Sequence, residues 1–186
     1  MLFYNLKNLL RNMHNFDDLI YRGTTFTLNG LEENHSKISE ELQTSGATSL
    51  VKNLQMIRSQ KVILAIGMFS LFESILQNGL SCKDGFAEAK KILTETGNIQ
   101  LRDRFEMFFL AINILKHGHG RSYDKLIAKS GLPFKIKQSG QDFFNEGDVS
   151  EISTLIEVDN EFVLNCAELI ENISKEIRTA RPTYYH

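Results

Sequence analysis

The sequence predicts an all-α protein, a helical bundle that carries a small β-hairpin before its last helix. Only 2 of its 186 residues are proline and 42% are hydrophobic, so long helices can form around a substantial core without the residue that interrupts them best. Apolar residues recur every three or four positions along much of the chain, which is the spacing that lines one face of a helix. A chain of this length is expected to form one domain, residues 1–186.

Three helices are predicted in the first half of the chain. The first is amphipathic and ends at Gly23 and the two threonines that follow it. A polar helix over 31–43 has few apolar residues and is expected at the surface. The third, over 49–80 with Ser49 as its N-cap, is the longest and most apolar, and is expected at the centre of the bundle. The buried stripe of the first helix is Leu6, Leu9, Leu10, Met13, Phe16 and Ile20.

Three short or medium helices are predicted next. The first, over 85–94, is begun by Asp84 as its N-cap. The second runs over 99–117 and ends in the stretch that contains His117 and His119. The third is short, with Ser122 to start it and Gly131 to end it.

The last part of the chain combines the predicted hairpin with the last helix. Residues 133–157 contain "FKIK", which alternates apolar and charged residues, and "TLIEV", which is rich in β-branched residues; together they predict a hairpin insertion. Asp159 or Asn160 is expected to cap the final helix, over 159–180. Residues 49–126 and this final helix are expected to form the bundle core.

The chain is close to neutral, but its charge is unevenly distributed. A net charge of −2 and a pI near 6.2 exclude a protein whose whole surface binds nucleic acid, since such proteins are clearly basic. Residues 116–137 contain six cations and one acid, Asp124, whereas residues 138–161 contain seven acids and no Lys or Arg. The cations are Lys116, Arg121, Lys125, Lys129, Lys135 and Lys137. A local basic patch is therefore predicted on a mildly acidic protein.

The sequence also indicates where the protein resides. Cys82 and Cys166 lack the close spacing of a metal knuckle or a redox pair and are expected to be reduced thiols. The N-terminus lacks the uninterrupted apolar stretch and cleavage site of a signal peptide. The longest apolar run, residues 62–72, is well short of the ~20 residues that cross a bilayer. A cytoplasmic protein without a membrane segment, a metal or a cofactor is expected.

The stretch "AINILKHGHGRSYDKL", residues 111–126, ends an apolar helix among two histidines and several cations. Asn113 and His117 are four residues apart and therefore project from the same helix face. His117 and His119 are natural acid and base candidates, because histidine titrates near neutral pH. The alternative is an ordinary helix end, because cations favour the negative end of the helix dipole and Gly118 suits a left-handed cap.

A long apolar helix over 49–80, followed by a helix that ends in Asn113 and His117, resembles the HEPN superfamily, small helical bundles of nucleotide-associated and RNA-cleaving proteins. The family motif is an arginine followed four to six residues later by a histidine, with a polar residue commonly just after the arginine. His117 takes the histidine position and Asn113 the polar position, but Ile112 stands at the arginine position. In active relatives, the motifs of two subunits meet across a dimer interface and cut RNA without a metal.

The resemblance implies a set of site residues. His117 is expected to act as acid or base with Asn113 in support, while Arg121 supplies the cation that the motif lacks. A buried acid needs a partner, so Glu73, in a largely apolar helix, is expected to orient His117 or to pair with Lys116 or Arg121; the alternative is a partly exposed side chain that faces the polar helix. Phosphate or RNA contacts are expected from Lys116, His119, Arg121 and Lys125.

Two functions remain open on these observations. One is a HEPN-like RNA- or nucleotide-directed protein, a metal-independent endoribonuclease of a bacterial toxin–antitoxin or phage-defence system that acts as a homodimer. The other is a non-catalytic dimeric helical module that binds a protein partner. Ile112 favours the second function, because isoleucine cannot stabilise an oxyanion. Whether the protein is an enzyme is therefore an open question at the level of sequence.

Overall fold

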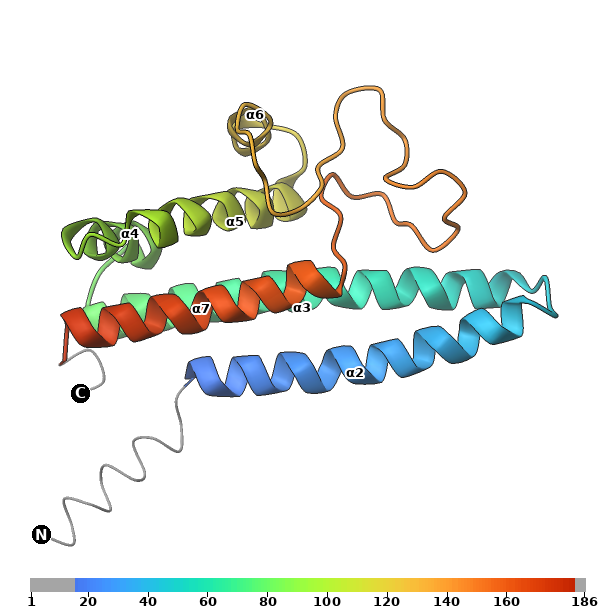
Figure 1. Ribbon diagram of the computed structural model, residues 1–186, viewed down its shortest axis with the longest axis horizontal. Coiled ribbons are helices and arrows are strands. Elements are labelled where there is room, and N and C mark those ends of the chain that lie inside the picture. Colours follow the sequence, from blue (N-terminus) through green and yellow to red (C-terminus); the bar gives the residue numbers. More distant parts are fainter. Residues whose placement is uncertain (1–15, 183–186) are drawn as a thin grey trace, which may run out of the picture.

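The structure, a computed structural model, describes residues 16–182 (Figure 1). Within this range the chain forms six helices and no strand, which confirms the predicted all-α class. The helices are α2 (Phe16–Leu42), α3 (Thr48–Leu80), α4 (Gly85–Glu95), α5 (Ile99–His117), α6 (Arg121–Ile127) and α7 (Asn160–Ala180). The first part of the predicted amphipathic stripe, Leu6 to Met13, lies outside the described residues.

The helices pack in three layers (Figure 1). α2 and α3 form an antiparallel pair joined by a short turn, and α7 packs against both. α4 and α5 lie on the opposite side of α3 and α7 from α2, and α6 crosses the far end of α5. Because α3 contacts α2, α4, α5 and α7, it occupies the central position that its apolar sequence predicts.

α2 is one helix where the sequence predicts two, so the expectation that Gly23 ends a helix is wrong. The helix continues through Gly23 and Thr24 without interruption. A glycine costs a helix about 1 kcal/mol, whereas burying one leucine side chain contributes about 1.5–3 kcal/mol. Thr24 and Leu28 are both buried, and Asp17 in the first turn pairs with Arg178 of α7. Tertiary contacts therefore outweigh the local preference to stop.

Two clusters of phenylalanine rings join the layers. The first joins α3, α4 and α5, with ring centroids 5.3 to 6.4 Å apart, and consists of Phe69, Phe72, Phe86 and Phe105. The second joins α5 and α7 to the segment between α6 and α7, with centroids 5.2 to 5.4 Å apart, and consists of Phe108, Phe134 and Phe162. Tilted and edge-on ring pairs of this kind contribute about 0.5–1.5 kcal/mol each beyond the area that they bury.

The helix ends test the predicted caps. Asp84 accepts a hydrogen bond from the backbone N–H of Ala87 at 2.8 Å, as predicted. Of the two candidates at the start of α7, Asp159 is the cap, and it accepts from the N–H of Phe162 at 2.8 Å. Ser49 and Ser122, by contrast, lie inside the first turns of α3 and α6 and do not cap them; Ala47 and a glycine hold the cap positions. α6 also ends at Ile127, before the predicted end at Gly131.

The predicted hairpin over 133–157 is not confirmed. Its two segments meet at a single antiparallel bridge between Ile136 and Ile156, and the rest of the segment is irregular. Acidic side chains bond several backbone N–H groups of the loop between the two segments. Asp148 accepts from one nearby backbone N–H and Glu151 accepts from two others, so side chains rather than a strand ladder hold this loop.

α3 is long and apolar enough to cross a membrane by length and composition, with a mean hydropathy of 1.4 over an 18-residue window. The uninterrupted apolar run of residues 62–72 is too short to cross a membrane. Further apolar residues precede and follow it, however, so a window of 18 residues is apolar as a whole. That window is 28% buried within the bundle, and a core helix of a soluble protein meets the same criterion of length and composition. The packing of α3 against four other helices is compatible with a soluble protein.

Gly85 is predicted to be the glycine at which a methyl group is least tolerated. A Cβ there would lie 2.7 Å from the Cβ of Leu76 and 2.8 Å from the carbonyl oxygen of Glu73, so the start of α4 would have to move away from α3. Gly85→Ala should lower the free energy of unfolding by about 1–3 kcal/mol. Chemical denaturation followed by circular dichroism measures this change.

Gly67, in the middle of α3, provides the matched control. A Cβ at Gly67 meets nothing within 4 Å, so Gly67→Ala should raise the free energy of unfolding by about 0.5–1 kcal/mol through helix propensity alone. Equal effects of the two substitutions would contradict the close approach of α3 and α4.

Candidate functional site

The polar end of α5 turns sharply into α6. The backbone N–H of Gly118 bonds to the carbonyl of Ile114 at 2.8 Å and closes α5. Gly118 has φ +71°, a positive value that glycine adopts without strain. The predicted helix end at this residue is therefore confirmed, and the turn places the first residues of α6 beside the last residues of α5.

The turn encloses a hollow of about 340 Å³ that opens to solvent. It is lined by Asn113, His117, Gly118, His119, Gly120, Arg121 and Ser122. Four of the side chains that the sequence singles out, namely those of Asn113, His117, His119 and Arg121, thus line one surface. Both histidines and the arginine are exposed. We refer to this place as the α5–α6 hollow.

The polar groups of the α5–α6 hollow are available for a ligand. The side chains of Asn113, His117 and Arg121 make no hydrogen bond or ion pair with any other part of the chain that the structure describes. The His119 ring contacts the edge of Tyr123, with centroids 4.6 Å apart, and this contact orients the imidazole at the start of α6. The hollow can therefore offer two imidazoles for proton transfer and a guanidinium for an anion.

Ile112 and Glu73 lie apart from the hollow. Ile112 is 4% exposed and belongs to the core, so the motif's arginine position faces the bundle interior. The main chain of Glu73 lies against the start of α4, since its carbonyl oxygen is the near neighbour of Gly85. Phe72 packs on Phe105, and the end of α5 is 12 residues beyond Phe105, about 18 Å at 1.5 Å per residue. The structure therefore does not bring Glu73 to His117.

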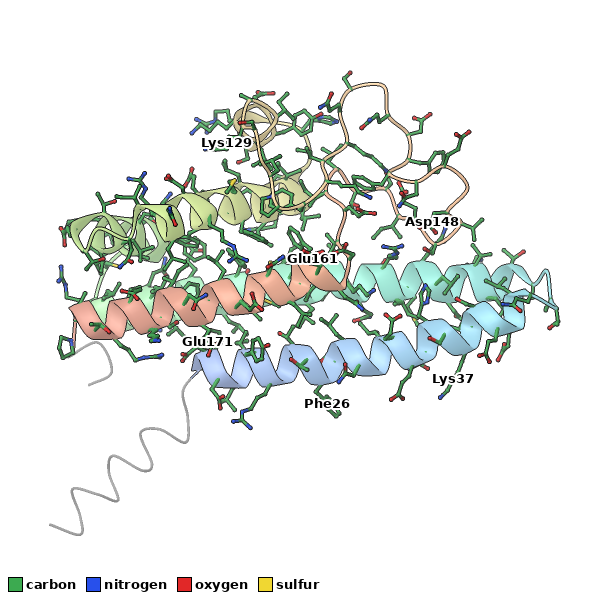
Figure 2. All side chains as sticks on the ribbon, in the orientation of Figure 1. Phe26, Lys37, Lys129, Asp148, Glu161 and Glu171 are labelled. Carbon is green, nitrogen blue, oxygen red and sulfur yellow. The ribbon has the colours of Figure 1, made fainter. Side chains whose placement is uncertain are left out.

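The predicted basic patch is smaller than its sequence suggests. Lys135 pairs with Glu157 at 3.1 Å, and Lys137 pairs with Glu151 at 2.7 Å. The four remaining cations are exposed, and none has an ion pair among the described residues: Lys116, Arg121, Lys125 and Lys129. They flank the hollow on α5, on α6 and just beyond α6, and Figure 2 labels Lys129 beside α6.

A buried ion pair fixes α6 from behind. Tyr123 is buried and donates its hydroxyl to the carbonyl of Lys137 at 2.8 Å. The Lys137 ammonium and the Glu151 carboxylate form an ion pair with side chains 7% and 9% exposed, and the ammonium also lies 4.6 Å from the centre of the Phe144 ring. Charge, hydrogen bonds and ring contacts therefore hold the segment between α6 and α7 against α6.

Glu151 keeps its charge despite its burial. Burial alone would raise the pKa of this carboxyl, but the hydrogen bond from Lys137 and those from the N–H groups of Phe144 and Asn145 outweigh it and lower the pKa. Asp148 behaves in the same way: burial opposes ionisation, and hydrogen bonds from Ser150 hold its pKa below the ordinary value. Most of the acidic run thus serves internal contacts.

A second group of polar residues lies around the start of α7, where sequence reasoning placed only a helix cap. It is centred on Lys61 of α3, which is 6% exposed. The signal in the sequence is a lysine between Ile57 and Ala65, four residues from each, on the buried stripe of an apolar helix. No group of three or more His, Cys, Asp or Glu residues suited to a metal ion occurs within residues 16–182.

The fold and the hollow define an all-α bundle with an exposed, histidine-containing basic turn. Comparison of the chain with protein-family models, with curated proteins and with solved structures finds no match. The function is therefore argued from the geometry of this chain.

Removing one partner of the buried ion pair is predicted to loosen the segment between α6 and α7. Lys137→Met leaves the Glu151 carboxylate buried without a cation and should lower the free energy of unfolding by about 3–5 kcal/mol. Lys137→Met/Glu151→Gln removes both charges, keeps an acceptor for the backbone, and should recover most of that loss. Thermal melts and amide hydrogen exchange at Phe144 measure both effects.

The exposed pair between Arg22 and Asp18, at 2.9 Å, is the control for this experiment. Arg22→Met should change the free energy of unfolding by less than about 1 kcal/mol, because solvent screens exposed ion pairs. A Lys137→Met effect as small as that of Arg22→Met would show that the Lys137–Glu151 pair does not hold the segment.

Acid is predicted to weaken the same contacts. A carboxyl whose pKa is lowered on folding stabilises the protein above its unfolded pKa, and this contribution is lost as pH falls through the folded pKa. The contribution of Glu151 should therefore be complete above its ordinary pKa of 4.5 and decline at lower pH. In Glu151→Gln the decline between pH 5 and pH 2 should be shallower in a pH series of thermal melts. An identical decline would contradict the lowered pKa.

Proposed function

We propose that the protein is an RNA- or nucleotide-directed helical protein of the bacterial cytoplasm that binds phosphate groups in the α5–α6 hollow. One observation carries the proposal: His117, His119 and Arg121 line a single solvent-open hollow. The exposed cations around it are left without ion pairs in the described part of the chain. Cations that are not neutralised by the protein attract a polyanion, and the release of its counterions favours binding.

The proposed reaction is cleavage of RNA without a metal. One histidine removes the proton of a ribose 2′-hydroxyl, and the 2′-oxygen attacks the adjacent phosphorus. The other histidine protonates the departing 5′-oxygen, which leaves a 2′,3′-cyclic phosphate and a 5′-hydroxyl end. Arg121 and Lys116 stabilise the added negative charge on the phosphate oxygens, and the Asn113 amide supports the orientation of the substrate.

The HEPN resemblance is retained in this proposal with one change. The motif's arginine would be replaced by Arg121, which approaches the histidines from the next helix. A homodimer is also proposed on the basis of this resemblance, since active HEPN relatives bring the motifs of two subunits together. A role in a toxin–antitoxin or phage-defence system follows from the resemblance alone.

A second candidate, a non-catalytic module that binds a protein partner, is favoured by a different observation. Large apolar side chains are exposed on two helices. Phe26 of α2 is 82% exposed and points away from the bundle in Figure 2. Met56, Ile63 and Leu71 of α3 are 52%, 61% and 55% exposed, and their spacing of seven and eight residues places them on one helix face. Large apolar side chains exposed along one helix face favour a binding face.

The nuclease proposal predicts RNA cleavage that depends on the α5–α6 hollow. Purified protein incubated with mixed single-stranded RNA in the presence of a chelator should give products that end in a cyclic phosphate. The rate should fall by about 10²–10⁴-fold in His117→Ala, since general acid–base catalysis has that magnitude. His35→Ala, which changes a histidine of α2 outside the hollow, is the matched control and should leave the rate unchanged.

RNA affinity separates the two candidate functions. Arg121→Ala should weaken binding and reduce the slope of log K against log salt by about 0.7, the value for one phosphate contact of a single strand. Lys37→Ala, on the exposed face of α2 (Figure 2), should change neither. Binding without cleavage would refute the catalytic part of the proposal and support the part that concerns phosphate binding. No affinity at low salt would refute both and leave the protein-binding module.

A further inference from the structure

α3 exposes a long face that carries no charge. Three large apolar side chains on it, those of Met56, Ile63 and Leu71, are 52%, 61% and 55% exposed. Every other exposed residue of α3 between positions 53 and 78 is an asparagine, a glutamine or a serine. We refer to the exposed residues of 53–78 as the neutral face. Because the exposed side of a helix in a soluble protein ordinarily carries charged residues, the neutral face is suited to contact with another surface.

Gly67 lies at the middle of the neutral face, four residues from Ile63 and four from Leu71. A glycine costs a helix about 1 kcal/mol relative to alanine, and a Cβ at Gly67 would meet nothing within 4 Å. No contact among the described residues therefore requires a glycine at this position. Glycine suits a place where a second backbone approaches closely, so this part of α3 is suited to close packing against a further helix.

The arrangement of residues around Gly67 is self-complementary. In a pair of antiparallel helices related by a two-fold axis at Gly67, residues equally far before and after the axis lie opposite each other. Ile63 of one copy then faces Leu71 of the other, and the same contact repeats on the other side of the axis. Gln60 faces Ser74 in the same way, so polar side chains meet polar ones. The two glycines meet between these contacts, where the backbones are closest.

The adjoining side of α2 widens this face. Phe16 stacks on Phe72 of α3, with ring centroids 6.5 Å apart, so the side of α2 that bears Phe16 faces α3. Leu19 and Phe26 are 54% and 82% exposed and lie within about 80° of Phe16 around the helix. Asp17, which contacts α7, lies about 160° away from Leu19. The exposed apolar residues of α2 are therefore on the side of α2 that adjoins α3.

The two helices together have the size of a stable interface. Residues 53–78 of α3 span about 38 Å at 1.5 Å per residue, and a helix with its side chains is about 10 Å wide. Two adjacent helices therefore present a footprint of roughly 760 Å², close to the ~800 Å² that each partner buries in a standard protein–protein interface.

The lack of charge on the neutral face selects the kind of partner. Nucleic acids and anionic lipid surfaces are bound by clusters of lysine and arginine, and a charged peptide is bound by side chains of the opposite charge. The exposed residues of 53–78 provide neither. An uncharged face of the same length fits, and a second copy of the chain provides one.

We propose that the protein forms a symmetric dimer in which the neutral face of α3 packs against the same face of a second copy, antiparallel and centred on Gly67. The proposal specifies a partner for the apolar residues that support the second candidate function, and it does not depend on RNA binding. The α5–α6 hollow shares no residue with the neutral face, and each hollow holds two histidines and Arg121 within one chain. The proposed cleavage therefore does not require the two hollows to meet in this dimer.

Sedimentation velocity of the full-length protein tests the proposal. Between about 1 and 200 µM, a range suited to an interface of this size, the mass should rise from 21.3 kDa towards twice that value. Ile63→Glu/Leu71→Glu places like charges opposite each other at both contacts and should weaken the dimer by at least about hundredfold. Ile63→Glu/Leu71→Lys places opposite charges there and should associate at least about tenfold more tightly than Ile63→Glu/Leu71→Glu.

Gly67→Ala should affect the dimer and the single chain in opposite directions. The two added methyl groups meet at the two-fold axis and should weaken the dimer by at least about tenfold, because a closely packed contact tolerates added volume poorly. The gain in unfolding free energy expected for Gly67→Ala from helix propensity applies to the dissociated chain, and it is measured at protein concentrations well below the dissociation constant.

Ile99→Glu is the matched control. It introduces the same charge at an apolar residue that is 41% exposed but lies at the start of α5, outside the neutral face. The mass of this variant should equal that of the parent protein at every concentration. Circular dichroism of all the charge variants should show the parent helix content, because the substituted side chains are exposed.

Three outcomes would overturn the proposal. A mass of 21.3 kDa at about 200 µM, the upper end of that range, would mean that another protein or residues 1–15 cover the neutral face. A dimer that withstands Ile63→Glu/Leu71→Glu would use a different surface. Equal association of the two charge variants would contradict antiparallel packing about Gly67. None of these results bears on RNA binding by the α5–α6 hollow, so the two proposals fail separately.

Discussion

The structure depends on the burial of α3. A helix of 33 residues with an apolar centre is unstable alone in water, because most helix stability in proteins comes from tertiary packing. α2, α4, α5 and α7 all pack on it, and the ring cluster around Phe69 and Phe72 joins it to α4 and α5. The positions of the other elements follow from this requirement. α4 approaches α3 so closely that only glycine fits at position 85, and α5 is then placed with its last turn extending past the ring clusters. The α5–α6 hollow lies at this end of α5 and is lined by residues of α5, α6 and the turn between them.

Charged residues determine the shape of the part that α3 does not organise. The segment between α6 and α7 has one β-bridge, but the Lys137–Glu151 pair, the Arg58–Asp148 pair and the bond from Tyr123 hold it in place. Buried ion pairs contribute little net stability, because desolvation opposes their attraction. Buried ion pairs nevertheless favour one arrangement of the chain over others, because breaking a pair leaves an uncompensated buried charge. The basic and acidic runs that adjoin in the sequence are therefore joined by two ion pairs, Lys135–Glu157 and Lys137–Glu151, and the other four cations remain for a partner.

Several local features of the sequence predicted the structure, although Ser122 does not cap α6, and most features that depend on distant contacts were missed. Asp84 and Asp159 cap their helices because a carboxylate three residues before a free N–H is a local arrangement, and Gly118 ends α5 for a similar reason. Gly23 misled the prediction, since the contacts that keep α2 helical come from α3 and α7. Asn113, His117, His119 and Arg121 meet because a short turn joins their helices, whereas the place of Glu73 depended on the register between α3 and α5. The burial of Lys61 was not predicted, because it depends on residues of other helices that pack around this lysine.

The ion pair between Asp17 and Arg178 has a consequence for the order of folding. It joins residues 161 positions apart, and Asp17 is 3% exposed. Closing so long a loop is slow in comparison with forming neighbouring helix pairs. While the chain is being synthesised, α2 can pair with α3 at once, but its buried acid stays without a cation until α7 leaves the ribosome. The first described helix therefore reaches its final state only when the last one is complete, and a truncated chain that lacks α7 exposes both the apolar side of α3 and an unpaired carboxylate.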